Sequence, residues 1–161
     1  MDASASATPR PTSPPEPQPA ARTDETFRSL SLDRVEPGVY LARNERGGEL
    51  RFGSDSGSDF TPVELLLASI AGCTAVDVDH MTSRRAAPLE FVVTAAGHKV
   101  REDGGSIMRD LTVTFRVRFP DGPDGDAARE VLPTALQVSH DRSCTVSRTI
   151  EAGVPVEIRL A

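Results

Sequence analysis

The sequence contains no tryptophan and only one tyrosine, so it lacks the aromatic side chains from which proteins build stacking platforms for nucleobases. Positively charged residues are outnumbered as well, because the sequence has 18 Lys and Arg residues and 24 Asp and Glu residues, which gives a net charge of −6. Nucleic acids and anionic membrane surfaces attract clusters of Lys and Arg. The composition therefore argues against both as partners.

Cysteine and histidine are scarce as well. The two cysteines, Cys73 and Cys144, are too few to form a disulfide scaffold in a chain of 161 residues. The three histidines form neither an H-x-x-x-H pair nor a partner to a C-x-x-C motif, so the sequence predicts no metal site.

The N-terminal segment lacks large apolar residues and holds six of the thirteen prolines. Such a segment cannot bury enough apolar surface to offset the entropy of ordering, so we expect residues 1–24 to form a disordered tail. It has no apolar stretch of the kind found in secretory signals, and we expect a cytoplasmic protein. Residues 25–161 are long enough for one domain with its own core.

The most structured stretch is Thr61 to Met81, for which several signals predict one long helix. Thr61 and Glu64 form a T-x-x-E capping box, and Pro62 occupies the first helical position, where its missing N–H costs nothing. The apolar residues point in nearly every direction around the axis, which predicts a helix buried on all sides. Three carboxylates, the last of them at Asp79, interrupt the apolar run and exclude a membrane span.

The rest of the chain predicts an α+β fold with mostly antiparallel pairing. Alternating apolar and polar residues predict strands over 27–35, 38–44 and 48–54 before the central helix, and a hairpin of 89–101 with 107–119 after it. A loop over 120–125 leads to a helix over 126–138, which Pro133 is expected to kink or divide. A short helix capped by Ser143 and a closing strand over 154–160 follow. One small sheet cannot cover so apolar a helix, so the pattern also favours a homodimer.

Chemistry is expected at the thiols, although two structural cysteines are the plainer alternative. Cys144 falls in the first turn of a helix close to Arg142 and Arg148, and both features favour the reactive thiolate. Cys73 lies in an apolar helix where burial raises the pKa of a thiol, so it becomes reactive only if a positive charge reaches it from outside the helix.

Three segments carry a resemblance to a known family: PVELLLASIAGCTAVDV in the central helix, SCTVSRTI downstream, and the C-terminal VPVEIRL. With this order of elements, the chain resembles the OsmC/Ohr family of osmotically inducible and organic hydroperoxide resistance proteins. The resemblance implies an intertwined homodimer in which antiparallel, strongly bent sheets enclose a long central helix from each subunit, with active sites at the subunit interface.

The resemblance also implies a chemistry, which is the reduction of organic hydroperoxides by two cysteines without metal or organic cofactor. By position, Cys73 would be the peroxidatic residue and Cys144 the resolving one. A dithiol such as reduced lipoamide would reduce the disulfide. Arg51 would stabilise the Cys73 thiolate.

The sequence departs from the family's peroxidases at Val63, where they carry a glutamate that orients the arginine. Glu64 comes one residue later and falls on nearly the opposite helix face from Cys73, so we interpret it as the partner of Thr61. An apolar Val63 leaves a second function open, namely a protein that binds an apolar small molecule at the dimer interface without peroxidase activity. His80, about two helical turns beyond Cys73, is too far for direct proton transfer, and His140 is interpreted as a polar loop residue.

Overall fold

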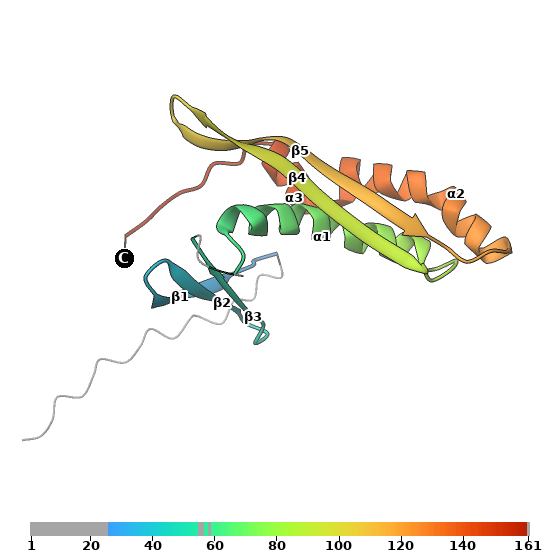
Figure 1. Cartoon of the computed structure of the whole chain (residues 1–161), viewed down its shortest axis with the longest axis horizontal. Helices are drawn as coiled ribbons and strands as arrows, with labels where there is room; N and C mark the ends of the chain where they lie inside the picture. Colours follow the sequence, from blue (N-terminus) through green and yellow to red (C-terminus); the bar gives the residue numbers. More distant parts are fainter. Residues whose placement is uncertain (1–25, 55–56, 58, 161) are drawn as a thin grey trace, which may run out of the picture.

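A computed structural model of the chain describes residues 26–54, 57 and 59–160 (Figure 1). The predicted disordered tail at residues 1–24 lies outside this range. The elements follow the order β1 (Leu30–Glu36), β2 (Val39–Asn44), β3 (Glu49–Gly53), α1 (Pro62–Thr82), β4 (Glu90–Glu102), β5 (Gly105–Arg118), α2 (Pro123–Val138), the π-helical turn η1 (Ser139–Ser143) and α3 (Thr145–Glu151). This confirms the α+β class and the antiparallel pairing expected from the sequence.

The first three strands form an antiparallel sheet with two unlike faces. Leu32, Ala42 and Leu50 lie opposite one another on one face, and Tyr40 stacks on Phe52 beside them with ring centroids 5.9 Å apart. The other face carries ion pairs, including that of Arg43 with Glu49 at 2.8 Å. Side chains on the apolar face remain open, since Leu32 is 52% and Leu50 is 42% exposed.

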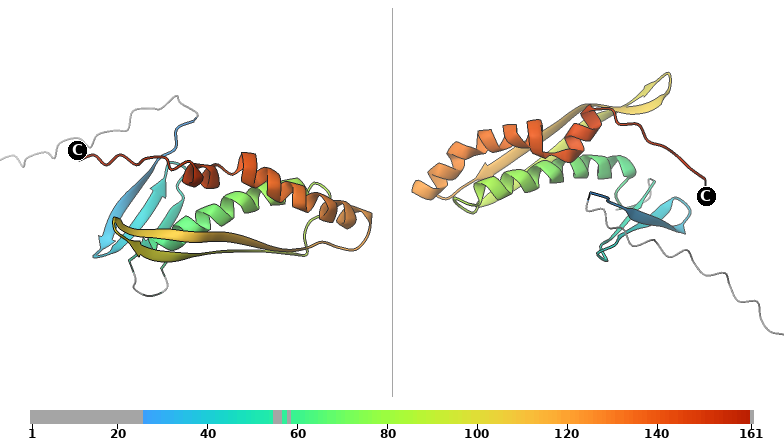
Figure 2. Two further views of the ribbon diagram at one scale, coloured as in Figure 1. Left: turned by 90° about the horizontal axis from the view of Figure 1, so that it is seen from above. Right: turned by 180° about the vertical axis from the view of Figure 1, so that it is seen from behind.

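The three-stranded sheet makes no extensive contact with the other described elements. Figure 1 shows it near the N-terminal end of α1, and the right view of Figure 2 shows it apart from α2 and the hairpin. Its apolar face is therefore a surface that the other described elements do not cover.

Helix α1 begins as the sequence predicts. The Glu64 N–H donates to Thr61 Oγ1 at 3.3 Å, and the Thr61 N–H donates to Glu64 Oε2 at 2.7 Å, which completes the capping box. The expectation that α1 is buried all round is wrong for the single chain. Only one stripe is buried, formed by Ile70, Thr74, Val78 and Thr82 at intervals of four residues. Val76, on another face, is 70% exposed.

The second half of the chain packs onto that buried stripe. Strands β4 and β5 form the hairpin expected from the sequence, and its turn is the two-residue pair Asp103-Gly104. Helix α1 contacts both α2 and β4, and a core of Ala86, Phe119 and Ala128 fills the end of this unit. Figure 2 shows α1 and α2 running side by side along the hairpin.

Three boundaries in the C-terminal half differ from the expectation. Helix α2 begins at Pro123, so the predicted loop 120–125 is shorter, because Pro is well suited to a first helical position. The helix continues through Pro133 without division. The cap of α3 is Cys144 and not Ser143, because residues 139–143 are taken up by a π-helical turn.

The closing strand predicted at 154–160 is wrong for the single chain. These residues are extended but pair with no strand, because no sheet edge of the described chain lies alongside them. Val156, Ile158 and Leu160 are 87%, 92% and 102% exposed. The β-type alternation is present in the sequence, and the strand partner it needs is missing from one chain.

Candidate active site

The structure brings Cys73 and Cys144 together although they are far apart in the sequence. Helix α1 carries Cys73 about midway along its length, and Cys144 stands at the junction of η1 and α3, both of which contact α1. The two thiols lie close enough for each to alter the pKa of the other. Both thiols are free in this structure, with Cys144 buried and Cys73 partly exposed.

The Cys144 sulfur is surrounded by hydrogen-bond donors. It accepts from the backbone N–H of Ser147 at 3.4 Å and lies 3.2 Å from Ser147 Oγ. Burial, the largest single influence, raises the pKa of Cys144, but the two Ser147 groups, Cys73 and Thr74 together lower it below its ordinary value. Hydrogen bonds to the charged form favour that form, so Cys144 is the thiol of the pair that ionises more readily.

Cys73 has the opposite tendency. Burial raises its pKa most, and the interaction with Cys144 and the negative charge of Asp77 raise it further, while a hydrogen bond from the Val146 N–H lowers it. The net result is a Cys73 pKa above the ordinary value of a thiol. Within one chain Cys144 is therefore the thiol that ionises more readily and Cys73 the thiol that ionises less readily.

Two hydrogen bonds through one serine link α1 to the segment that carries Cys144. The buried Ser139 donates its hydroxyl to Asp77 Oδ2 on α1 at 2.8 Å. Its carbonyl accepts the N–H of Cys144 at 2.8 Å, which closes the π-helical turn. Asp77 follows Cys73 by one helical turn, so the two residues of α1 face the two ends of η1.

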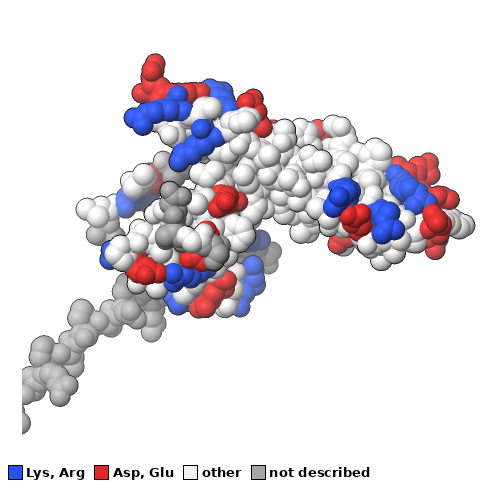
Figure 3. Space-filling model, in the orientation of Figure 1, with Lys and Arg blue, Asp and Glu red and all other residues white. Residues whose placement is uncertain are grey.

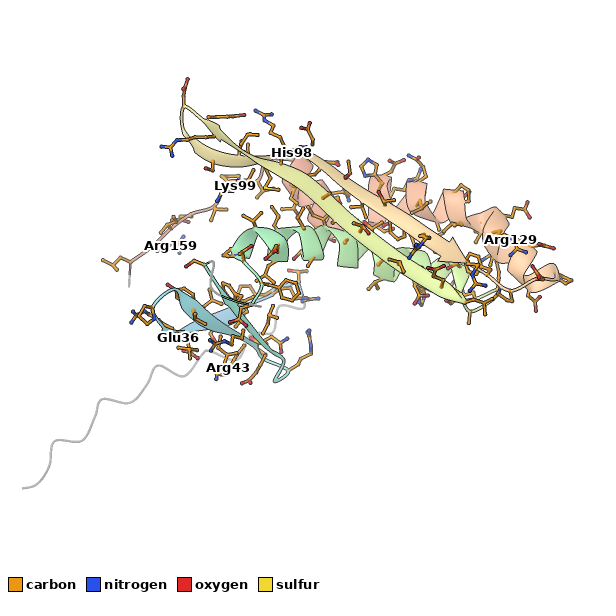
Figure 4. The ribbon with its side chains drawn as sticks, viewed as in Figure 1. Glu36, Arg43, His98, Lys99, Arg129 and Arg159 are labelled. Atoms are coloured by element: carbon orange, nitrogen blue, oxygen red, sulfur yellow. The ribbon has the colours of Figure 1, made fainter. Side chains whose placement is uncertain are left out.

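The other residues expected at the site lie elsewhere. Arg51 is on β3, where its Nε donates to Asp59 at 2.8 Å and its terminal nitrogen pairs with Glu36, and these carboxylates raise the pKa of its guanidinium. Figure 4 places Glu36 on the three-stranded sheet, away from the middle of α1. One chain alone therefore does not bring Arg51 to Cys73.

The two histidines considered in the sequence are engaged outside the thiol pair. His80 Nε2 lies 2.8 Å from a terminal nitrogen of Arg84, and His140 Nδ1 lies 3.9 Å from Glu151. Glu64 binds Thr61, whose N–H and hydroxyl lower the pKa of the carboxylate.

The sequence analysis missed three residues that contact the site: Thr74, Ser139 and Ser147. Ser147 could have been found, because it stands three positions after Cys144, the spacing at which an N-cap side chain meets a backbone N–H. Ser139 had no such signal, since its partner is sixty-two positions away.

A cavity of about 640 Å³ opens on the Cys144 side of the site, between α1, β5 and the C-terminal helices. Thr74 and Ser147, which interact with Cys144, form part of its wall, and His140 and Glu151 provide further polar groups. The remaining wall is mostly apolar and includes Ile70, Leu111, Val113, Phe115, Leu136 and Ile150. Volume and lining are those of a site for an apolar small molecule.

Within the described residues, no three or more His, Cys, Asp or Glu side chains cluster as metal ligands do. None of the helices in that part of the chain combines the length and the apolar character required to cross a membrane.

Comparison with known proteins agrees on one family. The sequence profile of the OsmC-like protein family matches residues 53–159. An uncharacterized protein of Mycobacterium tuberculosis is 26% identical over 133 residues, covering 81% of this chain and 94% of that protein.

Two solved structures have a similar fold. An OsmC-like protein of unknown function from Vibrio cholerae gives a TM-score of 0.65 at 11% identity, covering 78% of this chain and 94% of the other. A putative osmotic stress induced and detoxification response protein from Psychrobacter arcticus gives a TM-score of 0.54 at 14% identity. The match covers 80% of this chain and 91% of the other.

Proposed function

The chain belongs to the OsmC-like protein family, and from this premise we propose that it is a thiol-dependent peroxidase that reduces organic, alkyl or fatty-acid hydroperoxides. The observation that carries the proposal is that the fold brings Cys73 on α1 and Cys144 at the start of α3 close enough for each to alter the pKa of the other. The name of the Psychrobacter neighbour, which refers to detoxification, is consistent with this role.

The first step is a proton transfer within the pair. The Cys144 thiolate accepts the proton of Cys73, and the resulting Cys73 thiolate attacks the outer oxygen of the hydroperoxide. The O–O bond breaks, Cys73 becomes a sulfenic acid, and the leaving alkoxide takes the proton back from Cys144 to form the alcohol. A neighbouring sulfur thus serves as the base that a buried thiol needs.

The second step uses the Cys144 thiolate as the resolving nucleophile. It attacks the sulfur of the Cys73 sulfenic acid, a disulfide forms, and the departing hydroxide is protonated to water. Ser147 keeps Cys144 ionised through this step, because its N–H and hydroxyl hydrogen-bond to the sulfur. An external dithiol of the lipoamide type then reduces the disulfide by thiol exchange.

Arg51 enters this proposal through a second copy of the chain. The apolar face of the three-stranded sheet, the exposed faces of α1 and the unpaired tail 154–160 are surfaces that a homodimer would cover. In such a dimer, Arg51 would supply the positive charge that Cys73 lacks in one chain. Removing that charge by Arg51→Gln is expected to slow peroxide reduction, and Arg43→Gln on the same face of the sheet is the matched control.

The surroundings of the thiols suit an apolar substrate. The cavity beside Cys144 is lined mainly by aliphatic and aromatic side chains. Figure 3 shows few charged side chains over the middle of the molecule, whereas charges gather at the hairpin tip, at the three-stranded sheet and at the far end of α2. Hydrogen peroxide gains nothing from such contacts, so the proposal predicts faster reaction with cumene hydroperoxide.

The test is a reaction of the reduced protein with one equivalent of cumene hydroperoxide, followed by mass spectrometry of the wild type, Cys73→Ser and Cys144→Ser. We expect a Cys73–Cys144 disulfide in the wild type that dihydrolipoamide reduces, and a persistent sulfenic acid on Cys73 in Cys144→Ser. Survival of both thiols in the wild type would contradict the peroxidase proposal. A sulfenic acid on Cys144 in Cys73→Ser, with none on Cys73 in Cys144→Ser, would reverse the two roles.

A second function, binding of an apolar small molecule without peroxidase activity, is favoured by the cavity itself. Val63 adds apolar character near the start of α1 and leaves Arg51 without the carboxylate of the family's peroxidases. This alternative predicts that a long-chain alcohol protects both thiols from alkylation while peroxide leaves them unchanged.

A further inference from the structure

The side chain of Asp77 has no part in the reaction steps above, yet it lies at the centre of the contacts that hold the two thiols together. It belongs to the same helix face as Cys73, about 6 Å further along the axis at 1.5 Å per residue. Its carboxylate is partly buried and accepts the hydroxyl of the fully buried Ser139.

Ser139 connects this carboxylate directly to the backbone of Cys144. Its hydroxyl donates to Asp77, and its carbonyl accepts the Cys144 N–H across the five-residue turn η1. The segment 139–144 is therefore held on α1 by a first contact, the hydrogen bond from Ser139 to Asp77, and by a second where Cys144 lies close to Cys73 and Thr74. Loss of the first contact releases one end of the turn that positions the second.

We propose that Asp77 is a positioning residue of the two-thiol site: through Ser139 it docks the turn that carries Cys144 onto α1, and its charge keeps the proton on the Cys73 sulfur. This inference rests on the proposed function for its biological meaning, but both of its parts are measurable without peroxide turnover.

The charge part has a clear geometric basis. Asp77 lies one helical turn from Cys73 on the same helix face, and its negative charge raises the pKa of Cys73, because a like charge disfavours a thiolate. Several other charged or titratable side chains on α1, η1 and α3 have partners of their own. They are Glu64 with Thr61, Asp79 with Ser83, His80 with Arg84, His140 with Glu151, Asp141 with Gln137, and Arg148 with the Arg142 carbonyl, and η1 also carries the cation of Arg142.

The negative charge of Asp77 therefore opposes the ionisation of Cys73 from within the same helix. A positive charge from outside, such as the guanidinium proposed above, has to outweigh Asp77 before Cys73 ionises. The arrangement makes the reactivity of Cys73 conditional on complete assembly of the site, and it limits wasteful oxidation of an incomplete one.

The variants separate charge from position. Asp77→Asn keeps an oxygen that accepts the Ser139 hydroxyl but removes the charge, whereas Ser139→Ala removes the hydrogen bond and keeps the charge. Asp79→Asn is the matched control, because Asp79 also accepts a serine hydroxyl, that of Ser83 at 2.7 Å, on the exposed side of the same helix.

The first measurement is the rate of iodoacetamide alkylation of each cysteine between about pH 6 and pH 10, around the ordinary thiol pKa. Trypsin separates the two thiols into peptides 52–84 and 143–148. For Asp77→Asn we expect Cys73 to be alkylated about threefold faster or more near neutral pH, because one unfavourable charge is gone. Asp79→Asn should match the wild type, and an unchanged Cys73 pH profile in Asp77→Asn would overturn the charge part.

The second measurement is the equilibrium between the Cys73–Cys144 dithiol and its disulfide in a glutathione buffer. For Ser139→Ala we expect the disulfide to be disfavoured about fivefold or more, as loss of a hydrogen bond to a charged acceptor implies. Asp77→Ala should show the same loss, and wild-type equilibria in both variants would overturn the positioning part. Circular dichroism confirms that each variant is folded. If the wild type forms the disulfide here but does not react with hydroperoxide, the proposed function fails and this inference stands.

Discussion

The exposed tail at the C-terminus yields the sharpest prediction about assembly. Val154, Val156, Ile158 and Leu160 alternate with polar residues or proline, so an extended chain presents all four on one side. Ile158 is 92% exposed, and full burial of such a side chain contributes about 1.5–3 kcal/mol. In a symmetric dimer the contact occurs twice, so Ile158→Asp should destabilise the dimer by about 3–6 kcal/mol.

This magnitude corresponds to an increase in the dimer Kd of roughly a hundredfold or more. Sedimentation velocity over a concentration series measures it, with the wild type expected as a dimer. Glu157→Ala is the control, because Glu157 alternates with the apolar residues of the extended segment and pairs with Arg159. A monomeric wild type, or a variant that dimerises as tightly as the wild type, would refute the assignment of the tail to the interface.

Three further predictions concern the monomer fold and its pH dependence. In the wild type the pKa of Cys144 is lowered, so its contribution to the free energy of unfolding should be full above the unfolded-state pKa of about 8.5 and be lost as pH falls through the folded value. In Cys144→Ser, burial still raises the pKa of Cys73, so the contribution of Cys73 to the free energy of unfolding should be full below about pH 8.5 and be lost as pH rises. Urea titrations from acid to alkaline pH should show these opposite slopes. The carboxylate of Glu64 has a lowered pKa, so thermal melts should lose stability as acid protonates it, and Glu64→Gln should remove that part of the pH dependence. Gly125→Ala should cost about 2 kcal/mol or more, because a Cβ there would meet the Pro120 carbonyl oxygen at 1.8 Å, whereas Gly104→Ala has open space and should be neutral in chemical denaturation.

The elements set by local chemistry could be predicted from the sequence. The capping box of Thr61 and Glu64 marks the start of α1 because its hydrogen bonds span only three residues. The Asp-Gly turn marks the hairpin for the same reason. Local signals also placed a thiol at the start of α3, although the capping residue is Cys144 itself.

Features that depend on distant contacts escaped prediction. The burial of α1 was overestimated because an apolar helix gives no sign of which chain covers it. The strand at 154–160 has the right alternation, but a strand exists only where another strand offers its edge. The π-helical turn and the role of Ser139 arise from a bond to Asp77 across the fold, and the sequence has no pattern that pairs these two positions.

The reactivities of the two thiols should change differently when dimer formation is prevented. The reason is that the groups that favour each thiolate are proposed to come from different chains. The groups that lower the pKa of Cys144, namely Ser147, Cys73 and Thr74, all belong to its own chain. Burial and the negative charge of Asp77 raise the pKa of Cys73, so a cationic side chain supplied from outside the chain would favour its thiolate. If a second copy supplies that cation, Ile158→Asp should slow alkylation and oxidation of Cys73 while Cys144 keeps its own alkylation profile. Equal loss of reactivity at both cysteines would point to general unfolding, and unchanged reactivity at Cys73 in a monomeric variant would mean that its activation does not depend on the partner.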